Sequence, residues 1–142
     1  MAFASGTRAF IPPRAFARCM TQERWDYGKP AAEHISIEDF TKVDVRVGRI
    51  AALEAFPEAR KPSYKATVDF GALGTRRTSI AVAAWYAPEA MQDRLVAAVV
   101  NFPPRRIAGF ESEVLCLGAV QADGRVRLLR PEDGSELGSR VF

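Results

Sequence analysis

The sequence is poor in the residues from which metal centres and covalent catalytic sites are built. It holds one histidine, His34, and two cysteines, Cys19 and Cys116, which are too few and too far apart for a zinc site of ordinary ligand spacing. It contains no G-x-S-x-G motif, no glycine-rich phosphate loop with a lysine and no H-E-x-x-H motif. We therefore expect a protein that is not an enzyme and that carries neither a cofactor nor a metal.

Cysteine usage and hydropathy also restrict where the chain works. Cys116 lies among aliphatic residues, where a cysteine usually serves as an inert small hydrophobe. The chain therefore fits a reducing compartment or is indifferent to one. No apolar run approaches the length needed to cross a bilayer. We expect a cytoplasmic protein that does not insert into membranes.

An excess of charge of one sign is missing from most of the chain. The formal net charge is +3, and Arg8, Arg14 and Arg18 supply all of it, because residues 1–19 contain no acidic residue. From Met20 onward the basic and acidic residues cancel. Net charge therefore does not point to a polyanionic partner, and any such argument must rest on where the charges cluster.

Length and composition predict one domain behind an N-terminal extension. At 142 residues the chain is long enough to bury a single core. We interpret residues 1–33 as a flexible extension and residues 34–142 as the domain. Residues 1–19 resemble a transit peptide in their Ala, Phe and Arg content. The alternative, which we prefer, is that Met20 is the true start and residues 1–19 are a start-site artefact.

The domain opens with a short helix and a strand that changes phase. Ser36 is placed to cap one helical turn, with acidic residues near its positive end. Valines alternate with charged residues over 43–47, but after Gly48 the apolar positions become Ile50 and Ala52. An alternation that slips by one residue at a glycine predicts a β-bulge there. Strongly bent strands of this kind are what a small closed barrel requires.

The rest of the domain reads as all-β. Pro88 starts a short helix between the third and fourth strands, and Asp123-Gly124 closes a hairpin. A further short strand is expected near Arg140. This layout predicts an OB-fold, a five-stranded barrel with a short helix between strands 3 and 4. The strands after the first are expected at residues 64–70, 76–82, 95–100, 114–120 and 125–129.

The segment between the last two apolar runs is a loop that no core needs. Pro103 and Pro104 stiffen it and prevent either strand from continuing through it. Arg105 and Arg106 follow directly, so two guanidinium groups are presented at a fixed place, which suits an anionic ligand. The alternative is an ordinary solvated loop, because paired arginines are common on protein surfaces.

The expected barrel gathers basic residues on one side. In an OB-fold, strands 2 and 3 and the loops joining strands 1–2 and 4–5 form one ligand-facing surface. Local clustering of charge produces a field that net charge hides. Because Arg76 and Arg77 alternate on a strand, only one of them can face this surface. The basic residues expected on this side are Arg60, Lys61, Lys65, Arg76, Arg77, Arg105 and Arg106.

Four separated motifs resemble a known family. The chain is similar to the CsaA branch of the EMAP-type tRNA-binding domains, over about residues 35 to 142. The resemblance implies an OB-fold homodimer, tRNA binding in the wider family, and a role as a chaperone for protein export in this branch. The motifs are Asp39-Phe-Thr-Lys-Val-Asp-Val-Arg-Val-Gly48, Phe56-Pro-Glu-Ala-Arg-Lys-Pro62, Val100-Asn-Phe-Pro-Pro104 and Ser112-Glu-Val-Leu-Cys-Leu-Gly118.

By position, the resemblance assigns Asn101, Arg105, Ser112 and Glu113 to the tRNA-contacting segment. In the wider family this segment tends to read Ser-Glu-Gly-Met, whereas here Val114-Leu115 follows the glutamate. This departure leaves open whether the present branch binds tRNA as the synthetase-appended domains do.

Each of these assignments has a structural alternative. Asn101 could reach a phosphate or sugar, or it could cap its own turn. Glu113 could meet a nucleotide, or it could pair with Arg105 or Arg106. Phe102 and Phe110 could stack on bases or anchor the loop to the core.

Two functions from different classes therefore remain. The first is a dimeric module that binds tRNA through phosphate contacts and shape. The second is a dimeric chaperone that holds unfolded or pre-secretory polypeptides in an apolar groove. The aromatic residues that motivate the second function are Trp25, Tyr27, Phe56 and Trp85.

Overall fold

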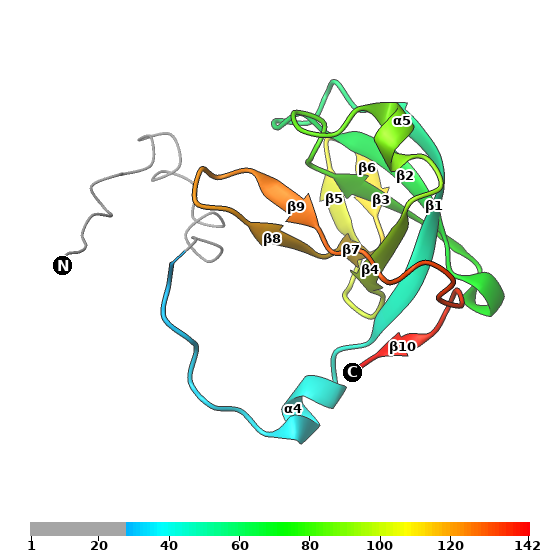
Figure 1. The fold of residues 1–142 in the computed structure, drawn as a ribbon. Coiled ribbons are helices and arrows are strands. Elements are labelled where there is room, and N and C mark those ends of the chain that lie inside the picture. Colours follow the sequence, from blue (N-terminus) through cyan, green and yellow to red (C-terminus); the bar gives the residue numbers. More distant parts are fainter. Residues whose placement is uncertain (1–27) are drawn as a thin grey trace. The chain divides into compact units, whose positions relative to one another are not determined.

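The computed structural model describes residues 28–142 (Figure 1). Contacts divide the chain into two compact units, and the unit that holds the barrel comprises Glu33–Ala119 and Val126–Phe142. The turn Val120–Arg125 is assigned to the other unit. Most of the proposed extension, with Cys19, Trp25 and Tyr27, lies outside the described residues, so the boundary at residue 33 stays a prediction.

Five antiparallel strands form a nearly closed barrel in the order β3-β2-β1-β4-β7. This arrangement confirms the all-β, OB-type barrel expected from the sequence. The strands are β1 (Val45–Ala55), β2 (Tyr64–Asp69), β3 (Thr75–Ile80), β4 (Leu95–Val99) and β7 (Leu115–Cys116).

Short helices and strands precede, connect and follow the strands of the barrel. Ser36 caps α4 as expected, because its hydroxyl accepts a hydrogen bond of 3.1 Å from the backbone N–H of Asp39. Pro88 opens α5 between β3 and β4, also as expected. Strand β10 pairs with β1 beside the C-terminus (Figure 1). These elements are α4 (Ile37–Thr41), η1 (Gly71–Leu73), α5 (Pro88–Met91), β8 (Gly118–Val120), β9 (Val126–Leu128) and β10 (Arg140–Val141).

The barrel interior explains why β4 is continuously apolar. Ile50, Val68 and Phe70 are completely buried in the main core, together with Val96 of β4. The other face of β4 is buried too, because Ala97 and Val99 form a second small cluster with Val45. A strand buried on both faces cannot alternate between polar and apolar residues.

The β-bulge predicted for the first strand is present, but its predicted position at Gly48 is wrong. The register between β1 and β2 shifts between Ile50 and Ala52 instead, and Ala52 is exposed. A Cβ atom at Gly48 would lie 2.6 Å from Cγ1 of Val68 and 2.7 Å from Cε1 of Phe70. The glycine is therefore required by the close approach of core side chains on β2 and at its end, and not by an irregular backbone.

The segment expected to be a plain loop contains a β-hairpin. Strand β5 (Arg105–Ile107) pairs with β6 (Phe110–Ser112) through a two-residue turn. Both turn residues have positive φ, 48° at Ala108 and 83° at Gly109, which matches the twist of a tight hairpin. The strand expected over residues 114–120 is correspondingly divided into β7 and β8, and β8 pairs with β9 as a separate two-stranded sheet. Among the described residues, no helix is long and apolar enough to span a bilayer.

Candidate nucleic-acid interface

The outer face of β2 and β3 carries two of the expected basic residues. Lys65 lies opposite Ser79 and Thr67 lies opposite Arg77, so all four side chains share the face turned away from the core. Arg76 lies on the opposite face of β3. Its guanidinium donates to the carbonyl oxygens of Leu73 (2.9 Å) and Thr75 (3.1 Å). The two arginines therefore alternate as predicted, and Arg77 is the one on this face.

Lys65 and Arg77 lie over aromatic rings. The ammonium nitrogen of Lys65 is 4.8 Å from the ring centroid of Phe56 and 5.4 Å from that of Phe110. The guanidinium carbon of Arg77 is 4.6 Å from the centroid of Phe110, and the two rings meet edge to face at 5.5 Å. The three distances between a cation and a ring centroid lie within the range of cation–π attraction. We call the four residues Phe56, Lys65, Arg77 and Phe110 the cation shelf.

Both rings of the cation shelf are buried, since Phe56 is 2% exposed and Phe110 is 7% exposed. Phe110 therefore anchors the hairpin, in agreement with the structural alternative for this residue. Phe102 is 48% exposed. The burial of Phe56 also removes one aromatic residue from the set that motivated a polypeptide-binding groove, while Trp85 stays 41% exposed.

Hydrogen bonds fix the hairpin to the free edge of β3. The Ser112 hydroxyl accepts from the backbone N–H of Ser79 at 3.1 Å and lies 3.1 Å from the hydroxyl of buried Thr78. Glu113 donates its backbone N–H to the carbonyl oxygen of Arg77 at 2.8 Å, and its carboxylate accepts the backbone N–H of Arg77 at 2.9 Å. These bonds satisfy backbone groups that a barrel edge would otherwise leave unpaired.

These bonds assign internal partners to three side chains that the family resemblance places near tRNA. Glu113 forms no ion pair with Arg105 or Arg106 within residues 28–142, so of its two alternatives the pairing with these arginines is wrong. The Asn101 amide accepts from the N–H of Asp44 at 2.9 Å and donates to the carbonyl oxygen of Lys42 at 2.8 Å. Asn101 therefore has internal partners but does not cap its own turn, because it bonds to residues 57 and 59 positions away. RNA contact at Asn101, Ser112 and Glu113 stays a prediction.

The two hairpin arginines face opposite ways. Arg105 lies opposite Ser112, so it shares the hairpin face that carries Phe110. Arg106 lies opposite Glu111 on the other face, and its guanidinium donates to the carbonyl oxygen of Gly109 at 3.3 Å. Only Arg105 is therefore directed to the same side as the cation shelf.

The remaining predicted cations lie in the loop between β1 and β2. Arg60 and Lys61 are exposed, and the loop is anchored at its start by buried Phe56 of the cation shelf. The Ser63 hydroxyl donates to the carbonyl oxygen of Lys61 at 2.8 Å and closes the loop. Of the seven cations expected on one side, three share the face of the cation shelf, namely Lys65, Arg77 and Arg105. Arg60 and Lys61 lie in the loop that begins at Phe56 of the shelf. Arg76 and Arg106 point elsewhere.

A second cluster of cations, at the start of β1, is bound by a carboxylate that balances one of its two charges. Arg46 binds the Asp44 carboxylate with an Nε–Oδ1 distance of 2.6 Å, and Arg140 Nε lies 3.5 Å from the same oxygen. The hydrogen bond from Arg46 lowers the pKa of Asp44 below its ordinary value of 3.8, and Arg140 adds to this effect. In contrast, among residues 28–142 no carboxylate lies within 4.0 Å of the charged groups of Lys65, Arg77 or Arg105.

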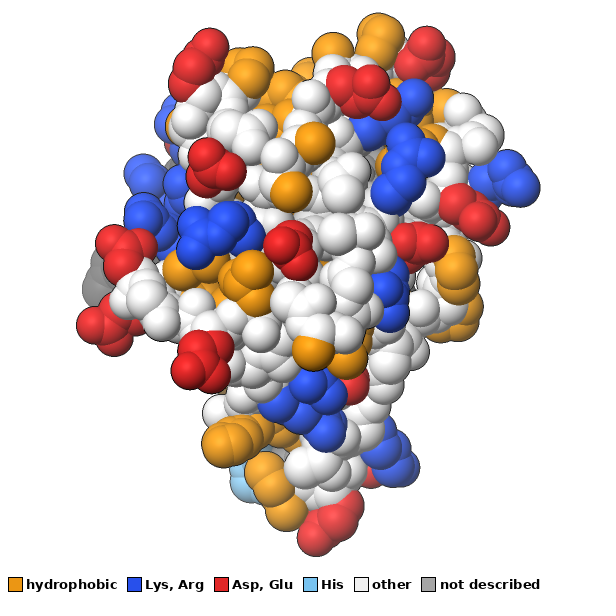
Figure 2. Space-filling model, turned by 90° about the vertical axis from the view of Figure 1, so that its right-hand side faces the viewer, with side chains coloured by type: hydrophobic (Ala, Val, Ile, Leu, Met, Phe, Trp, Pro, Cys, Tyr) orange, Lys and Arg blue, Asp and Glu red, His pale blue; other side chains and the backbone are white. Residues whose placement is uncertain are grey.

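Charge elsewhere on the described surface is mixed. On the face drawn in Figure 2, Lys and Arg side chains are interspersed with Asp and Glu side chains and with apolar groups. Within the described part of the chain, His, Cys, Asp and Glu side chains form no group suited to hold a metal ion. Burial raises the pKa of the Cys116 thiol to about 12, so this thiol stays protonated at neutral pH.

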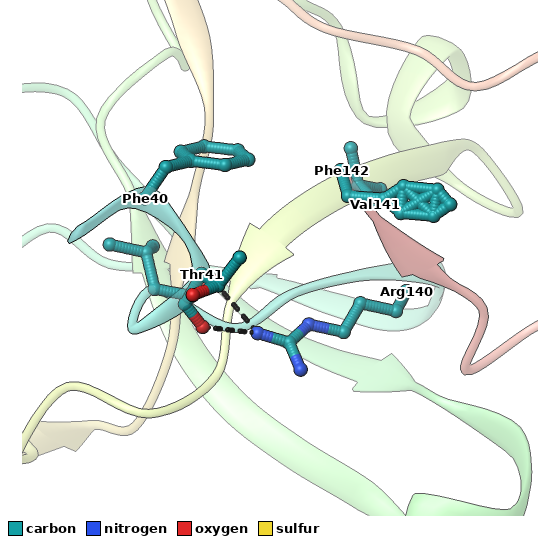
Figure 3. A pocket seen from close by; sticks show the side chains of 6 residues that line it. Phe40, Thr41, Arg140, Val141 and Phe142 are labelled. Atoms are coloured by element: carbon teal, nitrogen blue, oxygen red, sulfur yellow. Dashed lines mark hydrogen bonds between the residues drawn. The ribbon is translucent and has the colours of Figure 1, made fainter. Parts of the chain in front are cut away.

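An apolar hollow lies beside the start of β1, where β10 pairs with this strand. It is lined by Phe40, Thr41 and Val43 on one side and by Arg140, Val141 and Phe142 on the other, and its volume is about 170 Å³. In Figure 3 the guanidinium of Arg140 points to the carbonyl oxygen of Thr41, to which it donates at 2.6 Å. Phe142 is 91% exposed.

Sequence reasoning missed the role of Phe110 as a support for cations. The change from apolar Phe110 to charged Glu111 after Ala108-Gly109 is a signal for a strand that follows a tight turn, but not for contact of the ring with cations. The contact of the buried Thr78 hydroxyl with Ser112 had no visible signal in the sequence, since a threonine on a strand is equally suited to either face.

Comparisons with known proteins agree with this architecture. The family described as "putative tRNA binding domain" matches residues 45–140. The methionine–tRNA ligase of Porphyromonas gingivalis is 40% identical over 112 residues, which are 79% of this chain and 16% of the ligase. The methionine–tRNA ligase 1 of Sorangium cellulosum is 41% identical over 113 residues, 80% of this chain and 16% of that protein. The chain thus spans about a sixth of the length of these curated relatives.

Two solved structures match this chain over the whole of their own length. The CsaA chaperone protein of Picrophilus torridus superposes with a TM-score of 0.71 at 44% identity, covering 77% of this chain and 100% of the other. The chaperone CsaA of Bacillus anthracis superposes with a TM-score of 0.73 at 41% identity, covering 78% of this chain and 100% of the other. The chain therefore belongs to the family of putative tRNA-binding domains and is a protein of the CsaA type.

Proposed function

We propose that this chain is a cytoplasmic, non-catalytic module that binds tRNA as a homodimer through phosphate contacts. The observation that carries the proposal is the cation shelf, where Lys65 and Arg77 lie over aromatic rings and form no ion pair within the described residues. Arg105 lies on the same side, and Arg60 and Lys61 flank it. Lys65 and Arg77, which form no ion pair with a carboxylate of residues 28–142, thus make the kind of site that a nucleic-acid backbone requires.

The shelf suits recognition of the backbone rather than of the bases. Phe56 and Phe110 are buried under the cations, so neither ring offers a free face on which a base could stack. Affinity would then come from phosphate contacts and from the shape of folded RNA. The relatives named methionine–tRNA ligase contain this domain as a small part of their length, which supports a binding role and not ligase activity for the present chain.

Filter binding of tRNA to the full chain, titrated over a range of salt concentrations, tests this function. We expect affinity to fall steeply as salt increases, because each phosphate contact releases a counterion. Arg105→Ala combined with Arg106→Ala should lower the affinity and flatten the salt dependence. Arg127→Ala combined with Arg130→Ala removes two other exposed arginines and serves as the matched control. Absence of tRNA binding, or binding that does not respond to salt, would contradict the proposal.

The homodimer is tested separately by sedimentation equilibrium of the full chain. The proposal predicts a mass of twice the 15.6 kDa of one chain, independent of added tRNA. A monomer that still binds tRNA would remove the dimer from the proposal and leave the binding function intact.

A second candidate function is the holding of unfolded or pre-secretory polypeptides. Two solved relatives are named chaperones, and the hollow between α4 and β10 exposes apolar side chains, including Phe40 at 37% and Phe142 at 91%. Apolar contacts of this kind are far less sensitive to salt than phosphate contacts. The hollow lies apart from the cation shelf in sequence and shares no residue with it.

Binding of an unfolded polypeptide, measured at several salt concentrations, distinguishes the two functions. Reduced, carboxymethylated α-lactalbumin, a permanently unfolded polypeptide, should bind with little dependence on salt if the chaperone function holds. Phe40→Ser combined with Phe142→Ser should then weaken that binding and leave tRNA affinity unchanged. No binding of the unfolded polypeptide at any salt concentration would exclude this second function.

A further inference from the structure

Two like charges share one aromatic support in the cation shelf. The charged groups of Lys65 and Arg77 both lie within 5.4 Å of the Phe110 ring centroid. Lys65 and Arg77 are diagonal neighbours on one face of the β2–β3 pair, and the two distances to the ring place their charged groups no more than about 10 Å apart. The two cations therefore repel each other, and the negative face of the ring compensates only part of this repulsion. An anion placed between them would relieve the rest.

The carboxylates closest in register do not supply that anion. Glu54 lies opposite Lys65 in the pairing of β1 with β2, yet within residues 28–142 it forms no ion pair. Glu113 uses its carboxylate on the backbone N–H of Arg77. Glu111 lies on the opposite face of the hairpin, across from Arg106. The shelf is thus left with charge that the described residues do not compensate.

The ring that supports the cations is held from three directions. The tight turn at Ala108 and Gly109 places Phe110 at the start of β6, and Phe56 packs against its edge. Ser112 and Glu113 tie the following residues to the free edge of β3. A ring that cannot move keeps the two cations at a fixed separation, so little entropy is lost when they bind a ligand.

We infer that Phe110 is a positioning residue, which holds Lys65 and Arg77 as a binding site for one phosphodiester group of the RNA backbone. The inference rests on the proposed function and specifies the group that its site takes. A phosphodiester carries one negative charge and offers several acceptor oxygens, so the two donors can bind it together. Phe110 itself does not touch the RNA.

Substitution of the ring with its volume nearly kept tests this inference. Phe110→Leu should lower tRNA affinity about three- to tenfold at 0.1 M salt and reduce the slope of log affinity against log salt by about one, the share of one phosphate contact. Phe110→Tyr keeps the ring and should restore both values. Phe142→Leu removes an exposed ring in the hollow between α4 and β10, which shares no residue with the cation shelf, and should change neither value. A merely structural role of the ring would lower the amount of folded protein without altering the slope.

A second variant covers the case in which Phe110→Leu does not fold. Lys65→Gln removes one shelf cation from a partly exposed position and leaves the ring in place, and it should also reduce the salt slope by about one. If wild type binds tRNA and both folded variants keep its affinity and slope, the inference is overturned while the proposed function stands. If wild type does not bind tRNA, the proposed function itself fails.

Discussion

Two groups of cations in this protein have opposite fates. Around Asp44, the guanidinium groups of Arg46 and Arg140 converge on one carboxylate, and Arg46 also donates to the carbonyl oxygen of Gly138 at 2.9 Å. On the cation shelf, Lys65 and Arg77 lie over aromatic rings with no carboxylate within reach among the described residues. The first group ties β1 to the C-terminal segment, and the second keeps its charge for a ligand.

The difference shows that the number of basic residues does not locate a binding surface. Both groups combine strand arginines with nearby aromatic or apolar residues, and a count of charges along the sequence treats them alike. What separates them is the partner of each cation, a carboxylate in one case and an aromatic ring in the other. A ring fixes the position of a cation without cancelling its charge, whereas a carboxylate does both.

Removal of two cations from each group should separate them most strongly. Lys65→Gln combined with Arg77→Gln should lower tRNA affinity at least tenfold and reduce the salt slope by about one, because the single phosphate contact that the two cations share is lost. Arg46→Gln combined with Arg140→Gln removes the same net charge and should change tRNA affinity less than twofold. Filter binding at several salt concentrations measures both. Equal losses in the two double variants would erase the distinction between the groups.

The group of cations around Asp44 should instead contribute to the stability of the fold. Asp44→Asn removes the carboxylate that Arg46 and Arg140 share, and we expect the free energy of unfolding to fall by about 1 kcal/mol, as for a partly exposed ion pair. Urea denaturation of the folded protein measures this loss. The tRNA salt slope should stay at its wild-type value, and a changed slope would show that this region also meets RNA.

The same carboxylate predicts the direction of a pH effect. Because Arg46 lowers the pKa of folded Asp44 below 3.8, this interaction stabilises the fold fully above the unfolded pKa and is lost as pH falls through the folded pKa. Wild type and Asp44→Asn should therefore differ in unfolding free energy at pH 6, and this difference should shrink as the pH falls through the lowered pKa of folded Asp44. A difference that persists undiminished in acid would indicate that Asp44 acts through its shape and not through its charge.

The smallest expected effect compares the neighbouring hairpin arginines. Arg105→Ala should weaken tRNA binding about threefold, because Arg105 lies on the hairpin face that carries Phe110. Arg106→Ala should leave binding unchanged, since Arg106 lies on the opposite face beside Glu111. The reverse order of effects would mean that RNA approaches the hairpin from its other side.

Much of the fold could be predicted because burial leaves a direct trace in sequence. Continuous apolar residues marked β4, which is buried on both faces, and Ser36 marked the helix start. Gly48 was misread because a glycine shows that space or freedom is needed, but not which of the two. The β5–β6 hairpin was missed because Ala108-Gly109 is a weak turn signal beside two prolines.

The site was less predictable, because sequence gives a residue type and not the direction in which its polar atoms point. Asn101, Ser112 and Glu113 lie in the segment singled out by the family resemblance, yet their side chains bond to backbone groups of the protein. The alternation of Arg76 and Arg77 was foreseen, but which one faces outward depends on the register with β2. Contact of Phe110 with both cations depends on how the hairpin lies on the sheet, which no local pattern encodes.

The most direct test of the central claim is a nuclear magnetic resonance titration that follows individual arginine side chains as tRNA is added. We expect the Nε–Hε resonance of Arg77 to shift with saturation, because its guanidinium is held over Phe110 and not by a carboxylate. The resonance of Arg46, which is bound to Asp44, should stay in place. A saturating shift of Arg46, with Arg77 unchanged while tRNA is bound, would contradict the account.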